Sequence, residues 1–278
     1  MLTLLLGATA WASDLTVPQR ATANTAVTIG TSGSGEATLY VVGPAARIKQ
    51  KVELGKEVTL KPQQVTAAGR YTVILRNGGE TVTRSFMVDA GPAARVNFLA
   101  QPSRVPTGVH NVISGTAFVM DANNNLMLAP TPVRFELAVP GTAAVARTVT
   151  TKDGVAWTRM DSSKRAGNAE FTAAVGETVV RRVVQQTAAD PCNLRFKATP
   201  SKNGIRVQTD PVRDCSGNPV PDGTIVTFTS VSPEGKSTVD ARVKRGIAQA
   251  EFPAAPQATI TVASGVVLGN EVHWGGGR

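Results

Sequence analysis

The side chains that could carry out chemistry in this chain are few and widely separated. The two histidines, His110 and His273, lie far apart, and the sequence has no Gly-x-Ser-x-Gly motif. A hydrolytic triad needs a base beside a nucleophile and a third group that orients the base. The 20 acidic residues form no evident cluster. The sequence therefore predicts no catalytic residue, no cofactor and no metal site. An enzyme would instead need a cleft that gathers distant residues between domains.

The two cysteines, Cys192 and Cys215, are predicted to form a structural disulfide. An even number of cysteines in an exported chain is typical of disulfide bonding. Asn203-Gly204, a strong hairpin-turn signal, lies between two alternating segments. Folding about this turn places position 192 opposite position 215, and closing the loop stabilises by about 3 kcal/mol on the chain-entropy model. A redox pair is disfavoured by the absence of Cys-x-x-Cys, and a metal site with a distant histidine is the remaining alternative.

The segment Asp121-Ala-Asn-Asn-Asn125 has Asp and Asn at alternate positions, as a calcium-binding loop does. A complete EF-hand loop would also need Gly at its sixth position and Glu at its twelfth, where this chain has Leu126 and Pro132. Asp and Asn are also residues that a tight turn prefers. We therefore expect a turn here, with a calcium site as the alternative.

The chain carries a formal net charge of +9, and its basic residues are scattered. Arg47, Lys49 and Lys51 alternate along a predicted strand and so share one face. Smaller clusters occur at Arg181-Arg182 and at Arg242, Lys244 and Arg245. Such a face either keeps the protein soluble or binds an anionic ligand such as acidic polysaccharide. No stacking aromatic side chains accompany these residues, so nucleic-acid binding is not expected.

The sequence repeats with a period of about 95 residues. The repeated segments must therefore supply the strands and turns that position the side chains described above. The segment that begins at Pro92 and contains Phe98 reappears from Pro191 with Phe196. Asp121 precedes Phe135 by the same interval that separates Asp214 from Phe228. Many short, Val- and Thr-rich strands with regular turn signals are typical of β-sandwiches. The sequence therefore predicts an all-β protein of three tandem sandwiches.

We expect these domains at residues 14–90, 91–188 and 189–278. The linkers, Gly91-Pro92-Ala93-Ala94 and Ala188-Ala-Asp190-Pro191, are short and contain proline, which predicts a semi-rigid rod. Residues 1–12 are apolar and end in Ala10-Trp11-Ala12, the small-x-small pattern of a secretory signal peptide. The segment has no positive n-region, so the true start could lie upstream, and an N-terminal strand is the alternative.

Two motifs carry a resemblance to known folds. The pattern at Ala67-Ala-Gly69-Arg-Tyr71 resembles the tyrosine corner of immunoglobulin-like domains, in which the tyrosine hydroxyl bonds to the backbone just upstream. Asp214-Cys-Ser-Gly-Asn218-Pro-Val220, followed by Val226-Thr-Phe228 and Gly246-Ile-Ala248, resembles the bacterial immunoglobulin-like repeats of invasin and intimin. Residues 121–156 match these repeats more loosely. The resemblance implies modules that act as stalks, spacers or adhesive tips on bacterial envelopes.

These observations predict a non-enzymatic, exported structural or interaction protein. We expect it in the periplasm, on the cell surface or outside the cell, as an accessory or scaffold subunit of a larger envelope or extracellular assembly. Its expected partners are other proteins of that assembly, and the mature chain has no membrane-spanning segment of sufficient length. The alternative is an adhesin-like module that binds an anionic glycan or another surface ligand.

Overall fold

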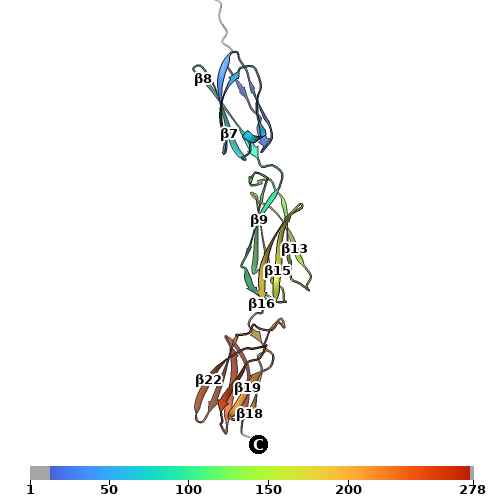
Figure 1. Cartoon of the computed structure of the whole chain (residues 1–278), viewed down its shortest axis with the longest axis vertical. Helices are drawn as coiled ribbons and strands as arrows, with labels where there is room; N and C mark the ends of the chain where they lie inside the picture. The colour runs from blue at the N-terminus through green and yellow to red at the C-terminus, as the bar shows by residue number, and fades with distance from the viewer. Residues whose placement is uncertain (1–12, 276–278) are drawn as a thin grey trace, which may run out of the picture.

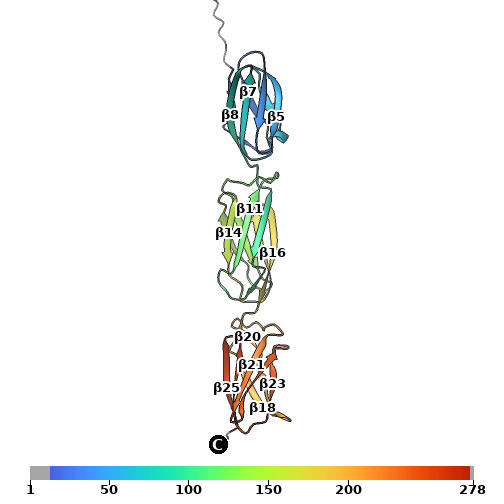
Figure 2. The ribbon, with the colours of Figure 1, turned by 90° about the vertical axis from the view of Figure 1, so that its left-hand side faces the viewer.

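The computed structural model describes residues 13–275 and consists of three β-sandwiches arranged end to end (Figures 1 and 2). Each sandwich has its own hydrophobic core. The buried residues of the three cores fall within 15–88, 96–184 and 194–262, and we call the three sandwiches modules 1, 2 and 3. The all-β tandem architecture expected from the sequence is confirmed. The predicted signal peptide, residues 1–12, lies outside the described residues.

Module 1 packs a three-stranded sheet, in the order β1-β3-β6, against a five-stranded sheet in the order β2-β8-β7-β4-β5. Strands β2 and β8 pair in parallel, and the other pairs are antiparallel. The elements are β1 (Leu15–Thr16), β2 (Arg20–Thr22), β3 (Val27–Thr31), β4 (Glu36–Val42), β5 (Arg47–Glu53), β6 (Val58–Leu60), the 3-10 turn η1 (Pro62–Gln64), β7 (Gly69–Asn77) and β8 (Glu80–Asp89).

Module 2 repeats this topology. Its sheets have the orders β14-β11-β9 and β10-β16-β15-β12-β13, and β10 again pairs with β16 in parallel. The strands are β9 (Arg95–Gln101), β10 (Arg104–Pro106), β11 (Ile113–Met120), β12 (Pro132–Ala138), β13 (Val145–Thr150), β14 (Val155–Met160), β15 (Gly167–Val175) and β16 (Thr178–Thr187).

Module 3 has the sheets β18-β19-β23 and β22-β21-β24-β25, together with the small pair β17-β20. The strands are β17 (Pro191–Cys192), β18 (Phe196–Ser201), β19 (Gly204–Thr209), β20 (Arg213–Asp214), β21 (Ile225–Ser232), β22 (Gly235–Arg242), β23 (Gln249–Pro253), β24 (Ala258–Ser264) and β25 (Val267–Trp274).

Alternation of side chains explains why these segments form half-buried strands. In β11 every second residue from Ile113 is buried, and the residues between them are only partly buried. A strand sends successive side chains to opposite faces, so this pattern places one row in the core. In module 2 the core centres on Phe98, Phe135 and Phe171, whose rings contact one another with centroids 5.0–6.2 Å apart.

The hairpin that follows Cys192 differs from its sequence-based prediction, because its turn lies one residue earlier and its strand partners are shifted by two residues. Ser201 pairs with Gly204, so Lys202 and Asn203 form the turn, and Cys192 faces Arg213 rather than Cys215. The reason lies in the neighbouring strand β23. A Cβ atom on Gly204 would lie 2.0 Å from the carbonyl oxygen of Phe252, so the glycine is used for a close strand contact instead of the turn.

The last strand, β25, pairs with β24 and contains His273 and Trp274. Trp274 packs against the core of module 3, and the His273 side chain remains exposed. A Cβ atom on Gly269 would lie 2.4 Å from the carbonyl oxygen of Leu194, so β25 needs glycine at this position.

Candidate functional site at the junctions between modules

A buried carboxylate organises the junction between modules 1 and 2. Asp121, at the end of β11, is only 1% exposed. Its Oδ1 atom accepts hydrogen bonds from the backbone N–H groups of Asn123 and Asn125, each at 2.8 Å. Its Oδ2 atom accepts from the N–H of Gly91 in the linker, at 2.9 Å. Both carboxylate oxygens therefore hold a tight turn and the linker, which are the bonds that the turn interpretation requires.

The turn presents one side chain to the preceding module. The Asn125 Nδ2 group donates to the carbonyl oxygen of Thr66 at 2.8 Å and to Asp121 Oδ2 at 2.7 Å. The Asn125 Oδ1 atom accepts the N–H of Ala68 at 2.8 Å. Thr66 and Ala68 lie just before β7 in module 1. The asparagine amide therefore joins two modules through a donor and an acceptor at once.

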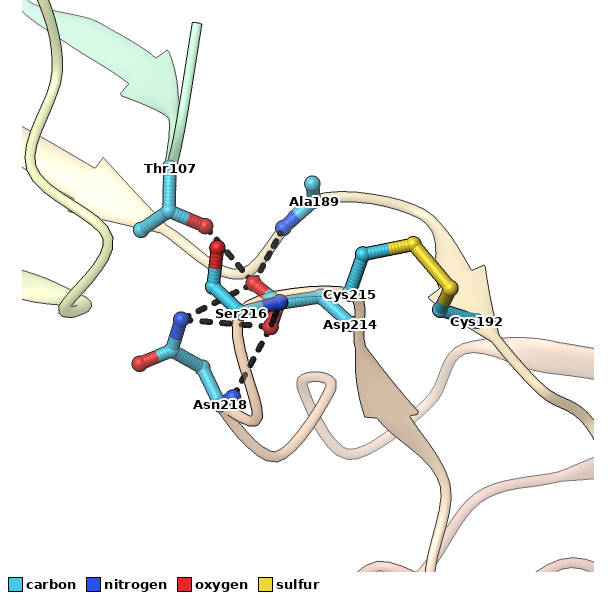
Figure 3. The surroundings of a disulfide bond; sticks show 7 residues. All are labelled: Thr107, Ala189, Cys192, Asp214, Cys215, Ser216 and Asn218. Atoms are coloured by element: carbon cyan, nitrogen blue, oxygen red, sulfur yellow. Dashed lines mark hydrogen bonds between the residues drawn. A yellow bond between two sulfur atoms is a disulfide. The ribbon is translucent and has the colours of Figure 1, made fainter.

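The junction between modules 2 and 3 repeats this arrangement. Asn218 Nδ2 donates to the carbonyl oxygen of Lys164 at 2.7 Å, and Asn218 Oδ1 accepts the N–H of Ala166 at 2.9 Å. Asp214, 4% exposed, lies four residues before this asparagine, as Asp121 does before Asn125. The Asp214 Oδ1 atom accepts the N–H groups of Ser216 and Asn218 at 2.9 and 2.8 Å (Figure 3).

The second junction has a hydrogen bond that the first lacks. Thr107 Oγ1 of module 2 donates to Asp214 Oδ2 at 2.6 Å, and Ala189 N–H donates to the same oxygen at 3.1 Å (Figure 3). The position of Thr107 in module 1 is taken by Ala23: each is the residue that follows the parallel strand, and each donates its N–H to the last residue of the partner strand. Ala23 has no hydroxyl group, so Asp121 receives no equivalent bond.

The two carboxyl groups are held in their charged form. Burial acts to raise the pKa of Asp121, but hydrogen bonds from Asn125, Gly91 and Asn123 outweigh it and lower that pKa. Burial likewise acts to raise the pKa of Asp214, and the bonds from Thr107, Asn218 and Ala189 lower it. Hydrogen bonds that favour the ionised carboxylate have this effect. Both groups therefore serve the junctions as anions at neutral pH.

The disulfide braces the second junction. Cys192 and Cys215 are bonded, as the sequence predicts, with an S–S distance of 2.04 Å. Cys215 lies inside the Asp214–Asn218 turn, and Cys192 lies in β17, directly after the linker (Figure 3). The bond therefore ties the turn that contacts module 2 to the chain segment that enters module 3. A disulfide fits an oxidising compartment.

The other residues singled out from the sequence lie away from the junction contacts or only support them. The Tyr71 hydroxyl donates to the carbonyl oxygen of Ala67 at 3.0 Å, and its ring stacks on Phe86. This bond holds the segment that Asn125 contacts. Asn203 and Gly204 lie in the β18–β19 hairpin.

The basic residues of β5 lie on the exposed face of an edge strand. Lys51 pairs with Glu36 at 3.6 Å, and the Lys49 ammonium lies 5.8 Å from the centre of the Tyr40 ring. Arg47 faces Val42 across the β4–β5 pair. Two of the three charges are therefore already engaged with neighbouring side chains.

Sequence reasoning missed Asn125 and Asn218 as contact residues. A signal was present, because both repeats have Asp followed four residues later by Asn. That spacing indicates a turn, but it does not show that the amide faces a different module. The partners, Thr66, Ala68, Lys164 and Ala166, lie more than 50 residues upstream of their asparagines.

Solved structures of bacterial adhesins and invasins share this fold. FdeC, described as an Escherichia coli adhesin, aligns with 95% of this chain and 96% of its own, with a TM-score of 0.66 and 15% identity. InvD of Yersinia pseudotuberculosis aligns with 94% of this chain and 96% of its own, with a TM-score of 0.53 and 15% identity. Invasin, a bacterial integrin-binding protein, aligns with 92% of this chain and 57% of its own, with a TM-score of 0.51 and 14% identity.

At these identities the likeness shows the fold alone. The three modules share the tandem sandwich fold of FdeC, InvD and invasin, which is the fold that the repeat motifs imply. No protein-family model and no curated protein matches the sequence. Within residues 13–275, no helix has the length and apolar character needed to cross a membrane.

Proposed function

We propose that this chain is a non-enzymatic, exported spacer that holds another protein of a bacterial envelope or extracellular assembly at a fixed distance and orientation. The observation that carries this proposal is the repeated junction, in which an Asp–Asn pair joins module 2 to module 1 and a second pair joins module 3 to module 2. Modules joined only by a linker would by default move relative to one another. Two matching sets of hydrogen bonds, most of them partly buried, oppose that motion.

The remaining observations support a location outside the cytoplasm and a surface role. The disulfide suits an oxidising compartment. The structural neighbours FdeC, InvD and invasin are an adhesin, a Yersinia protein and an integrin-binding protein, all with the same tandem fold. Within this proposal the modules correspond to residues 14–90, 91–188 and 189–278. Exposed edge strands such as β5 and β22 are available for contacts with partner proteins.

The proposal is tested by gentle purification of the native protein from its source cells, followed by mass spectrometry. A spacer co-purifies at fixed stoichiometry with a larger envelope or extracellular protein. Recovery as a lone monomer under conditions that preserve known envelope complexes would contradict the proposal.

A further inference from the structure

A basic hollow opens on the side of module 3, between its two sheets. It is lined by residues of β19, β22 and β23 and of the turn between β22 and β23, and its volume is about 870 Å³. This size falls within the range typical of small-ligand sites. Four of its lining side chains are basic, Arg206, Arg242, Lys244 and Arg245, and two are acidic, Asp240 and Glu251.

The four basic side chains have no acidic partner. Among residues 13–275, none of them lies within 4.0 Å of a carboxylate oxygen. The two acidic side chains instead accept hydrogen bonds from hydroxyl groups outside the hollow's lining: Thr227 Oγ1 donates to Asp240 at 2.6 Å, and Ser201 Oγ donates to Glu251. These hydroxyl groups do not neutralise the carboxylates, so the lining has four positive and two negative charges, and its net charge of +2 favours an incoming anion.

One of these arginines occupies a position that the fold does not favour. Arg245 and Gly246 form a two-residue turn, closed by the Lys244–Ile247 bridge, with φ angles of 52° and 82°. The equivalent turn of module 2 is Asp153-Gly154, with φ angles of 51° and 80°. Asp-Gly is a preferred pair for such a turn, whereas a long side chain at a positive φ is disfavoured. Strain of this kind gathers at functional sites.

The same sheet row differs between the two modules. In module 3, Lys197, Gln208 and Gln249 face one another across β18, β19 and β23. The corresponding row of module 2 is Leu99, Thr116 and Trp157. In module 3 this row therefore carries the amides of Gln208 and Gln249, which line the hollow, and the ammonium group of Lys197.

We infer that this hollow of module 3 binds an acidic glycan, with Arg242, Lys244 and Arg245 on its charged groups and the Gln208 and Gln249 amides on its hydroxyl groups. Guanidinium and ammonium groups form charge-assisted hydrogen bonds with sulfate and carboxylate oxygens. No aromatic side chain lines the hollow, so it offers no stacking platform for nucleic-acid bases. This inference does not depend on the spacer role, because a freely jointed chain would carry the same hollow.

The test is isothermal titration calorimetry of the full chain with a heparin-derived sulfated decasaccharide at two salt concentrations. The double variant Arg242→Gln/Lys244→Gln should bind at least about tenfold more weakly and show a smaller salt dependence, since each lost contact removes a charge interaction. The matched control is Arg47→Gln/Lys49→Gln, which removes the same charge from the β5 face and should change affinity less than about twofold.

Two further arms fix the ligand class. A hexamer of polygalacturonate tests carboxylate in place of sulfate, and binding to either glycan that is lost in the hollow variant supports the inference. A single-stranded DNA 12-mer carries a similar charge, and binding it more tightly than both glycans would overturn the inference. Equal loss in the hollow variant and the β5 control would also overturn it, because net charge alone would then explain the binding.

Discussion

The two junctions between modules use the same pair of side chains but differ in how that pair is supported. At the first junction, Asp121 accepts one hydrogen bond from the linker, and Ala23 occupies the position equivalent to Thr107. At the second junction, Asp214 also accepts a hydrogen bond from Thr107 Oγ1, and the disulfide constrains the turn. A groove of about 930 Å³ opens beside the first junction and is lined by Met87 of module 1 and Leu128 of module 2, among others. The repeated motif therefore sets the geometry of both junctions, and the added bonds make the second one stiffer.

The largest expected effect comes from removing the carboxylates. Asp214→Ala would leave the buried Thr107 hydroxyl and several partly buried N–H groups without an acceptor, which should destabilise module 3 and its junction by about 3 kcal/mol. Asp121→Ala removes the same group at the junction with fewer donors, so its effect should be smaller. Urea unfolding monitored by hydrogen exchange in each module measures both. Equal losses would contradict the difference in support between the two junctions.

Removal of the disulfide should affect only the second junction. Cys192→Ser/Cys215→Ser opens a loop with a sequence separation of 23, which should cost roughly 3 kcal/mol on the chain-entropy model. Amide exchange should rise in the Asp214–Asn218 turn and around Lys164, and should stay unchanged around Thr66 and Asn125. Increased exchange at both junctions would show that the disulfide does not act locally.

Acid should weaken both junctions. The pKa values of Asp121 and Asp214 are lower in the folded chain than in the unfolded chain, so the unfolded chain binds more protons as the pH falls. The stabilisation is complete above the unfolded pKa of about 3.9 and is lost as the pH falls through the folded values. Scattering measurements between pH 7 and pH 2 should show the rod becoming flexible only in the most acidic range. Loss of extension near pH 6 would point to other groups.

The smallest effect comes from exchanging the residues that distinguish the junctions. Thr107→Val keeps the side-chain shape and removes the hydroxyl, which should destabilise the second junction by about 1.5 kcal/mol. Ala23→Thr supplies a hydroxyl near Asp121 and should stabilise the first junction by a smaller amount. Thermal unfolding of the two single variants checks both signs. Loss of stability in both variants would mean that the hydroxyl at position 107 is specific to its own junction.

The sequence predicts much of this fold because its strands alternate and its turns use residues with clear preferences. The disulfide, the three-part repeat and the Asp121 and Asp214 turns are all visible as local patterns. The predicted hairpin register was wrong because Gly204 makes a close contact with β23, a strand that is distant in the sequence. The roles of Asn125 and Asn218 could not be predicted because their partners belong to another module. The hollow of module 3 likewise depends on strands brought together only by the fold.

The central claim is that the two asparagines hold the modules in line. Small-angle X-ray scattering of the chain tests it most directly, with the double variant Asn125→Ala/Asn218→Ala and the control Asn123→Ala. The Asn123 side chain lies in the same turn as Asn125 and is exposed. We expect a narrow range of extended shapes for the parent and the control and a broad, more compact range for the double variant. Identical scattering from all three proteins would contradict the claim.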